Sequence, residues 1–216
     1  MKQDIETRLI VLNRIFDVYD KFSQDFQTVC DKGCAECCTR NVTLTTLEGY
    51  NIINSLEENE KKEKLKLVKN DSAVERFIPQ ITINQMAKLC MEGKEIPDEN
   101  CDPSWGACPL LKENKCTVYN TRPFACRCMM SKNKCADSGF ADMDDFAVTL
   151  NNVFIQYIEH IDMGGFFGNL TDILLFAGEN DKDEAGLIKN SGVEMLMVPP
   201  EHQEKIREVI QKLQKI

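Results

Sequence analysis

Two groups of cysteines are the residues of this chain best suited to chemistry. The first group lies within residues 30–38 and consists of Cys30, Cys34, Cys37 and Cys38. The second lies within residues 108–128 and consists of Cys108, Cys116, Cys126 and Cys128. Thiolates at short spacing can surround a zinc ion, or the irons of an iron–sulfur cluster, without a long ordered loop between each pair. The eight cysteines therefore predict a metal site, and we expect the two groups to meet in space.

The composition favours metal ligands over disulfides. The chain has 216 residues, of which 43% are apolar, so its core does not depend on cross-links. Residues 1–6 run into charged, helix-patterned sequence, with no basic segment followed by an apolar one, and we therefore expect a cytoplasmic protein. Cysteines in the cytosol are more often metal or redox groups than disulfides, and the odd total of 11 points the same way.

The net charge disfavours several classes of partner. At −9, the chain has no excess of Lys and Arg that would attract a phosphate backbone or an anionic lipid surface. The apolar run at residues 173–177 is far too short to span a bilayer. We expect a metal ion or cluster as a partner, no nucleic acid and no membrane; a protein partner stays possible but is not identified by the sequence.

The elements that position the cysteines are expected to be mainly helical. An apolar stripe at helical spacing predicts a long helix over residues 4–26. Val42 and Leu44 alternate with polar residues in a short extended segment, and Thr45 with Glu48 forms a capping box that opens the next helix. The charged run 57–69 indicates a solvated helical face.

The second half of the chain repeats this pattern after an irregular loop over residues 93–104. An amphipathic helix is predicted for residues 144–161, and Gly164-Gly165 ends it. The rest is predicted to comprise a shorter helix over 170–176, a strand over 195–198 and a last helix from Glu201. The fold class is thus mainly α, with amphipathic helices surrounding irregular cysteine-rich metal-binding loops. We expect a single domain over 1–216, with a metal-binding region at 30–135 between the helix at 4–26 and a C-terminal helical part at 140–216.

The first cysteine group has two unusual features. Gly33 can adopt the positive φ that a ligand loop needs to turn its amides toward sulfur. Cys37 and Cys38 are adjacent, so their side chains diverge and favour two different metal atoms, or one ligand and one packed thiol. The spacing of Cys30, Cys34 and Cys37 also matches the triplet of radical S-adenosylmethionine enzymes, but Glu36 stands where those enzymes have an aromatic residue and no βα repetition follows.

The second group makes the pattern specific. From Cys116 it reads Cys-x-Val-Tyr-x-x-Arg-Pro-x-x-Cys-Arg. With Cys34-x-x-Cys37-Cys38 upstream, it resembles the YkgJ-like cysteine-cluster family, a zinc- or iron-chelating domain named for a C-x-x-C-x-x-C-C signature, from which Cys30 departs by one extra residue. The resemblance covers residues 30–128. It implies seven ligand candidates, which are Cys30, Cys34, Cys37, Cys38, Cys108, Cys116 and Cys126.

Other polar residues have weaker assignments. Arg122 and Arg127 would offset the negative charge of a thiolate site, although Arg122 could instead bond a backbone carbonyl or a carboxylate. Cys128 and Cys135 could complete an eight-thiol set, Cys90 is expected to be buried in helix packing, and the role of Cys101 stays open.

The leading function is a metal-binding protein with a structural, metal-handling or electron-transfer role. We favour an iron–sulfur cluster over zinc, because the second group lacks the paired C-x-x-C knuckles of zinc sites. The alternative, by resemblance, is an S-adenosylmethionine-dependent protein lysine N-methyltransferase related to flagellin lysine methylase. Whether the chain is an enzyme stays open. No catalytic residue is identified, since the only histidines, His160 and His202, lie far apart and no phosphate-binding loop or nucleophile elbow occurs.

Overall fold

Helices make up about half of the chain and sheet very little of it, so the predicted mainly α class is confirmed. A computed structural model describes residues 2–179 and 183–216. The helices are α1 (Lys2–Ser23), α2 (Thr46–Asn54), α3 (Glu58–Asp71), α4 (Ile83–Met91), α5 (Phe124–Arg127), α6 (Cys135–Ser138), α7 (Asp145–Ile161), α8 (Leu170–Gly178) and α9 (Gln203–Leu213). Short 3-10 turns are η1 (Pro103–Trp105), η2 (Tyr119–Thr121) and η3 (Pro200–His202). Within the described residues, no helix has the length and apolar character needed to cross a bilayer.

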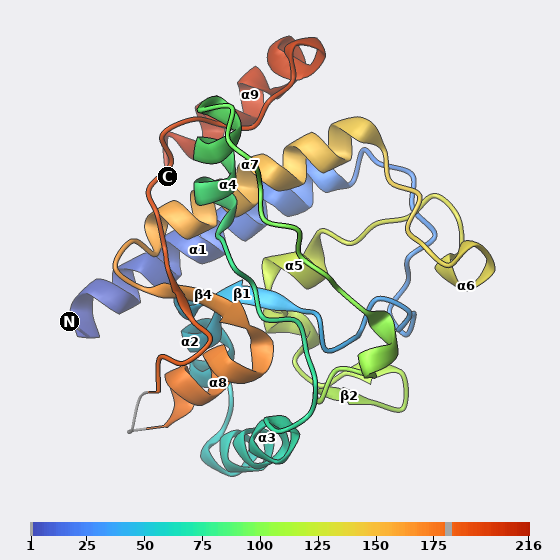
Figure 1. Ribbon diagram of the computed structural model, residues 1–216, viewed down its shortest axis with the longest axis vertical. Helices are drawn as coiled ribbons and strands as arrows, with labels where there is room; N and C mark the ends of the chain where they lie inside the picture. The colour runs from blue at the N-terminus through green and yellow to red at the C-terminus, as the bar shows by residue number, and fades with distance from the viewer. Residues whose placement is uncertain (1, 180–182) are drawn as a thin grey trace.

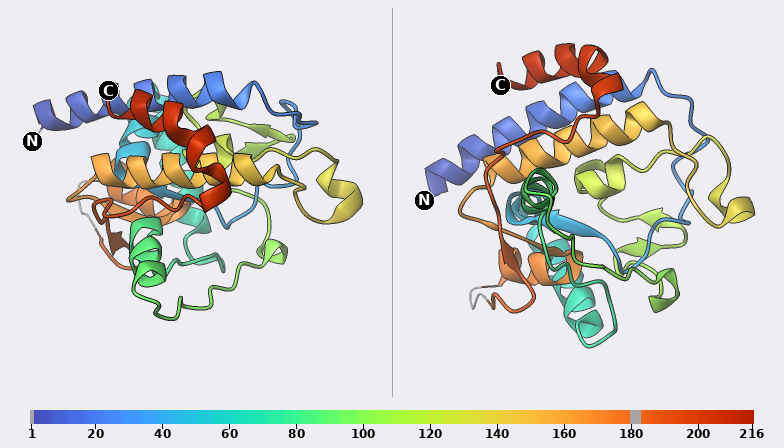
Figure 2. Two further views of the ribbon diagram at one scale, coloured as in Figure 1. Left: turned by 90° about the horizontal axis from the view of Figure 1, so that it is seen from above. Right: turned by 45° about the horizontal axis from the view of Figure 1, so that its top comes forward.

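Two long helices, α1 and α7, lie side by side and form the main core (Figures 1 and 2). Tyr19 of α1 packs its ring edge against Phe154 of α7, with ring centroids 5.1 Å apart. The Tyr19 hydroxyl donates to Asn151 Oδ1 at 2.8 Å, which satisfies its buried polar atom. Helix α9 covers the pair with Ile206, Val209 and Leu213. The stripe predicted for residues 4–26 is therefore a core-facing helix, although it ends at Ser23.

A small antiparallel sheet joins the two halves of the chain. Its order is β1 (Thr43–Thr45), β4 (Phe166–Asn169) and β5 (Ile188–Lys189), and a separate hairpin pairs β2 (Leu111–Lys112) with β3 (Lys115–Cys116). Strand β1 confirms the predicted extended segment, and the capping box of Thr45 and Glu48 is present at the start of α2. In the register, Leu44 of β1 lies opposite Gly168 of β4. A Cβ at position 168 would lie 2.5 Å from the Leu187 side chain, so a residue larger than glycine would clash there.

The predicted strand over residues 195–198 is wrong. This segment has a bend at Met195 and a tight turn in which the Val198 amide donates to the Leu196 carbonyl at 2.9 Å, and one side chain bonds to its backbone in place of a strand partner. Gln156 on α7 accepts from the Met197 amide at 2.8 Å and donates to the Met195 carbonyl at 2.7 Å. The strands that follow α7 are β4 and β5, neither of which was predicted.

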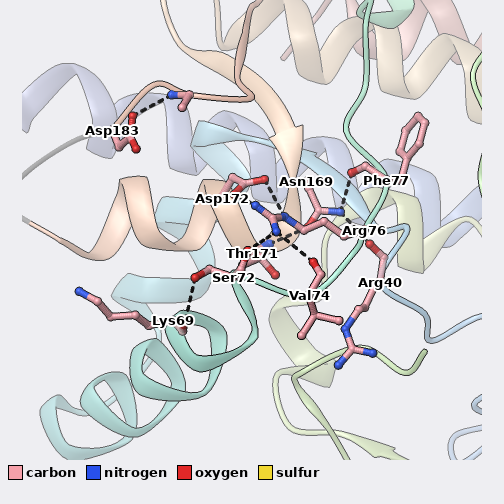
Figure 3. Close-up of polar contacts among 11 residues, drawn as sticks. Arg40, Lys69, Ser72, Val74, Arg76, Phe77, Asn169, Thr171, Asp172 and Asp183 are labelled. Atoms are coloured by element: carbon pink, nitrogen blue, oxygen red, sulfur yellow. Dashed lines mark hydrogen bonds and ion pairs between the residues drawn. The ribbon is translucent and has the colours of Figure 1, made fainter. Parts of the chain in front are cut away.

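Buried polar side chains connect β1, α8 and the long loops. The amide of Asn169 donates to the carbonyl of Arg40 at 2.7 Å and to that of Phe77 at 2.9 Å (Figure 3). Arg76 pairs with Asp172 through two bonds, which fixes the loop after α3 to the start of α8. These contacts hold residues 40–42, which continue from the first cysteine group, in one place.

A buried carboxylate, Asp162, joins the end of α7 to the start of α2. Its Oδ2 accepts from Thr46 Oγ1 at 2.7 Å, from the Leu47 amide at 3.1 Å and from Asn190 Nδ2 at 2.9 Å. Burial nevertheless dominates and raises the pKa of Asp162 to about 6. The folded protein therefore holds the Asp162 proton more tightly than the unfolded chain does.

We expect this group to make stability depend on pH. Because the carboxyl pKa is raised in the folded protein, it adds stability. This stability is fully present below the pKa of Asp162 in the unfolded chain, near 4, and is lost as pH rises through about 6. Asp162→Asn keeps the accepting oxygen and removes the titration. The unfolding free energy of the natural protein, relative to that of this variant, should be about 1 kcal/mol larger at about pH 5 than at about pH 7.5, which means that the natural protein is relatively more stable at the lower pH. Urea unfolding at both pH values measures it, and an unchanged difference would contradict the assignment.

Candidate metal centre

The backbone brings the two cysteine groups together, as predicted. The Cys108 amide donates to the Cys38 carbonyl at 2.9 Å, and the Arg40 amide donates to the Gly106 carbonyl at 3.0 Å. Thr39 and Ala107 form a bridge between these two bonds. The end of the first group and the start of the second therefore run past each other as a short antiparallel pair.

Seven of the predicted thiols line one cavity of about 210 Å³. They are Cys30, Cys34, Cys37, Cys38, Cys108, Cys116 and Cys126. Apolar side chains, including Val42, Leu110 and Leu170, line the same cavity, and Tyr119, Arg122 and Arg127 also border it. This is the most concentrated set of soft ligands that we find in the described part of the chain.

Short local structures hold these thiols in position. Gly33 has a φ of +112°, as the loop was predicted to need, and the Cys34 amide donates to the Asp31 carbonyl at 2.9 Å. Strand β3 carries Cys116, which lies opposite Leu111 across the hairpin. Helix α5 carries Cys126, whose amide donates to the Pro123 carbonyl at 3.0 Å. The first group lies on a loop, whereas the second has regular elements beneath it.

A buried glutamate anchors α5. Glu48 Oε1 accepts from the Phe124 amide at 2.7 Å, and its Oε2 accepts from the Thr45 amide at 2.8 Å. Both bonds satisfy amides at helix starts, so one carboxylate fixes α5 against α2. The capping box was visible in the sequence, but the link to Cys126 was not.

The thiols strongly affect one another. Burial raises the pKa of Cys126 well above its usual value and that of Cys108 to about 11, and neighbouring cysteines add to both shifts. The Cys37 thiol donates to Cys38, which raises the pKa of Cys37 and lowers that of Cys38. Negative charge is therefore costly in the cavity, and a bound cation would supply the missing compensation.

Two thiols of the first group are open to solvent, and the other two are partly buried. Cys34 and Cys37 are exposed, while Cys126 on α5 is partly buried. No three His, Cys, Asp or Glu side chains within residues 2–179 and 183–216 are already grouped as a set that could hold an ion. Ligation would therefore require the thiol side chains that line the cavity to move closer together.

Two arginines border the cavity, and a third, Arg40, acts on one of its thiols. Arg122 stacks on the Tyr119 ring at 4.0 Å and donates to the Tyr119 carbonyl at 2.9 Å, which is the backbone contact considered as its alternative role. Its charge opposes the rise in the pKa of Cys116, which burial dominates. Arg127 pairs with Asp20 at 3.1 Å. Sequence reasoning missed Arg40, whose charge opposes the burial-driven rise in the pKa of Cys108.

The remaining cysteines lie elsewhere. Cys128 is 7% exposed and packs in the core between α1 and α7; its sulfur approaches the Ala125 carbonyl at 3.5 Å, and it does not line the cavity. Cys90 was expected to be buried, but it is exposed near the end of α4, where the cover over Asn84 and Ala87 does not extend. Cys101 is exposed, and Cys135 lies at the start of α6, outside the cavity lining.

A cavity lined by seven thiols within a mainly helical fold defines a cysteine-cluster protein. The model of one family matches residues 29–146 of the 216, and that family is described as "CxxCxxCC: Putative zinc- or iron-chelating domain". The match spans more than half of the chain, which therefore belongs to this family. The resemblance to the YkgJ-like cysteine-cluster family is confirmed. No curated protein and no solved structure matches the chain.

Proposed function

We propose that the chain is a metalloprotein whose centre is held by the seven cysteines of the cavity. The observation that carries the proposal is their meeting in one cavity, although the sequence separates them into two groups. Thiolates are the ligands that zinc and iron–sulfur clusters prefer. The family supports a zinc- or iron-chelating role. Cys128 is left out of this ligand set because its side chain packs in the core.

We further propose that the metal is iron, in an iron–sulfur cluster. A single tetrahedral zinc uses four ligands at most, whereas the cavity is lined by seven thiols. Bound there, a cluster would supply one-electron transfer, and the surrounding arginines would favour its negatively charged forms.

The chain's own residues have defined tasks in this proposal. Arg40, Arg122 and Arg127 offset thiolate charge, and the Gly33 turn presents amides of the first loop to the cavity. Val42, Leu110 and Leu170 limit the access of water from the side of the core. All of these residues except Arg40 line the cavity, whichever metal is present. In the described residues we find nothing that favours the methyltransferase alternative, and we do not propose it.

Metal analysis of anaerobically purified protein tests the proposal. We expect a brown protein with broad visible absorption and iron and sulfide in similar amounts. A colourless protein with stoichiometric zinc would overturn the iron–sulfur assignment and keep the thiol centre. Protein without iron or zinc, and unable to take up either after anaerobic reconstitution, would overturn the thiol centre itself.

A further inference from the structure

A second cavity, of about 200 Å³, lies on the other side of α5 from the cysteines. Strands β1 and β4, helices α5 and α7, and the segments on both sides of α4 enclose it; Figure 1 shows these segments running past β1 and α5. Its apolar wall includes Leu44, Phe77, Ile81, Met86, Ile158 and Phe167. This cavity takes no part in the proposed metal centre.

Three carboxylates, but no Lys, Arg or His, are among the lining residues. They are Glu48 from α2, Glu159 from α7 and Glu99 from the loop after α4. In the part of the chain that the structure describes, none of the three forms an ion pair. An apolar cavity with negative groups and no cation has a negative potential that water screens poorly.

The two deeper carboxylates, Glu48 and Glu159, accept hydrogen bonds from backbone amides. Glu159 accepts from the Asn84 amide at 2.8 Å and from the Ser191 amide at 2.7 Å, while Glu48 holds α5 as described above. Burial raises the pKa of both groups despite these bonds. A positive charge in the cavity would therefore stabilise their ionised forms.

Glu99 lies at the partly exposed side of the cavity. Its Oε1 accepts from the Gln80 amide at 2.5 Å and from the Ile81 amide at 3.4 Å. Both contacts are made by one oxygen, so Oε2 remains available to a ligand. The same contacts fix the Glu99 side chain beside Ile81, at the border between the apolar wall and solvent.

We propose that this cavity binds a small organic cation, namely a primary amine with an apolar body. The apolar body would contact Ile81, Met86 and Phe167, and the ammonium group would pair with Glu99. The volume suits a body of about one aromatic ring, since a cavity of about 150 Å³ accommodates benzene. Charge complementarity favours an amine over a neutral or an acidic molecule of the same shape.

Benzylamine, benzyl alcohol and benzoate are the probes that test this proposal. In titrations of the full chain followed by ¹⁵N NMR, we expect benzylamine to bind at about 1 mM, as its eight heavy atoms allow. Benzyl alcohol should bind at least about tenfold more weakly, and benzoate should not bind measurably. The shifted amides should include those of Ala125 and Phe167, which line the cavity from opposite elements.

Glu99→Gln provides the specific test, because its amide oxygen can still accept from Gln80 and Ile81 while the charge is lost. We expect this variant to lose most of the preference for the amine over the alcohol. Glu95→Gln removes the same charge from the same loop, at an exposed residue outside the cavity lining, and should bind like the natural protein.

Several results would overturn the proposal. They are equal affinity for amine and alcohol, equal effects of the two variants, shifts confined to residues outside the cavity, or no binding up to about 20 mM. Circular dichroism of each variant checks that it folds. None of these outcomes depends on which metal the cysteines hold, because the probes need no metal ligand.

Discussion

Replacing Cys116 by Ser is expected to remove most of the bound metal and to expose residues 93–135 to protease. Cys116 lies on a two-residue strand, and few side chains between 93 and 135 are buried. These few are Leu110, Val118, Phe124, Cys128 and Ser131, together with Pro123. Such a segment has little core of its own to offset its chain entropy, so bound metal would supply much of its order. A structural metal in a thiolate site is worth about 10 kcal/mol or more, and serine is a far poorer ligand.

Metal content and limited proteolysis measure this effect, and helical circular dichroism should change little. Cys37→Ser is expected to behave in the same way. Cys90→Ser is the matched control, since Cys90 is exposed on α4 and outside the cavity. Cys128→Ser should also keep the metal, because that thiol packs in the core. If the Cys116 variant keeps full metal content and a protected loop, Cys116 is not a ligand and the proposed centre loses its support.

Replacing Phe124 by Ala is expected to destabilise the protein by about 3 to 5 kcal/mol. Phe124 is 2% exposed, and its ring lies 4.7 Å from that of Tyr19 and 5.8 Å from that of Phe154. The substitution removes these aromatic contacts and leaves a void between α1, α5 and α7. Because α5 also carries Cys126, the loosened helix should bind metal more weakly as well.

Urea unfolding measures the loss of stability, and metal titration measures the second effect. Phe124→Leu keeps most of the apolar volume and serves as the control. We expect it to lower the unfolding free energy by less than about 1.5 kcal/mol, as size-conserving apolar substitutions do. A Phe124→Ala variant as stable as the Leu variant would mean that the core closes over the site. The aromatic cluster would then not be what holds α5 in place.

Local patterns predicted the helices well. The apolar stripes of α1 and α7, and the capping box of α2, depend on residues within a few positions of each other. By contrast, β4 was missed because its short sequence, Phe-Phe-Gly-Asn, has no alternation of its own. It is a strand because β1, from the other half of the chain, bonds to it. Gln156 likewise decided that residues 195–197 would not join a sheet.

For the cysteines too, local sequence predicted one part of the site and long-range packing decided the rest. Their spacing and types indicated a thiol metal site and the correct family, but they did not distinguish Cys126 from Cys128. These residues are two apart at the end of α5, and side chains two apart on a helix do not share a face. One thiol consequently enters the cavity, while the other enters the core.

By itself, the sequence determined the mainly α class and the family, and it indicated which cysteines are candidate ligands, because all three depend on residue types and short spacings. Only the tertiary structure decided which thiols share a cavity, which arginines reach it and where the buried carboxylates lie. Arg40, Glu48 and Glu99 acquired their positions through partners far away in the chain. Such partners are chosen by how helices and loops pack, which leaves no signal in the local spacing of residues.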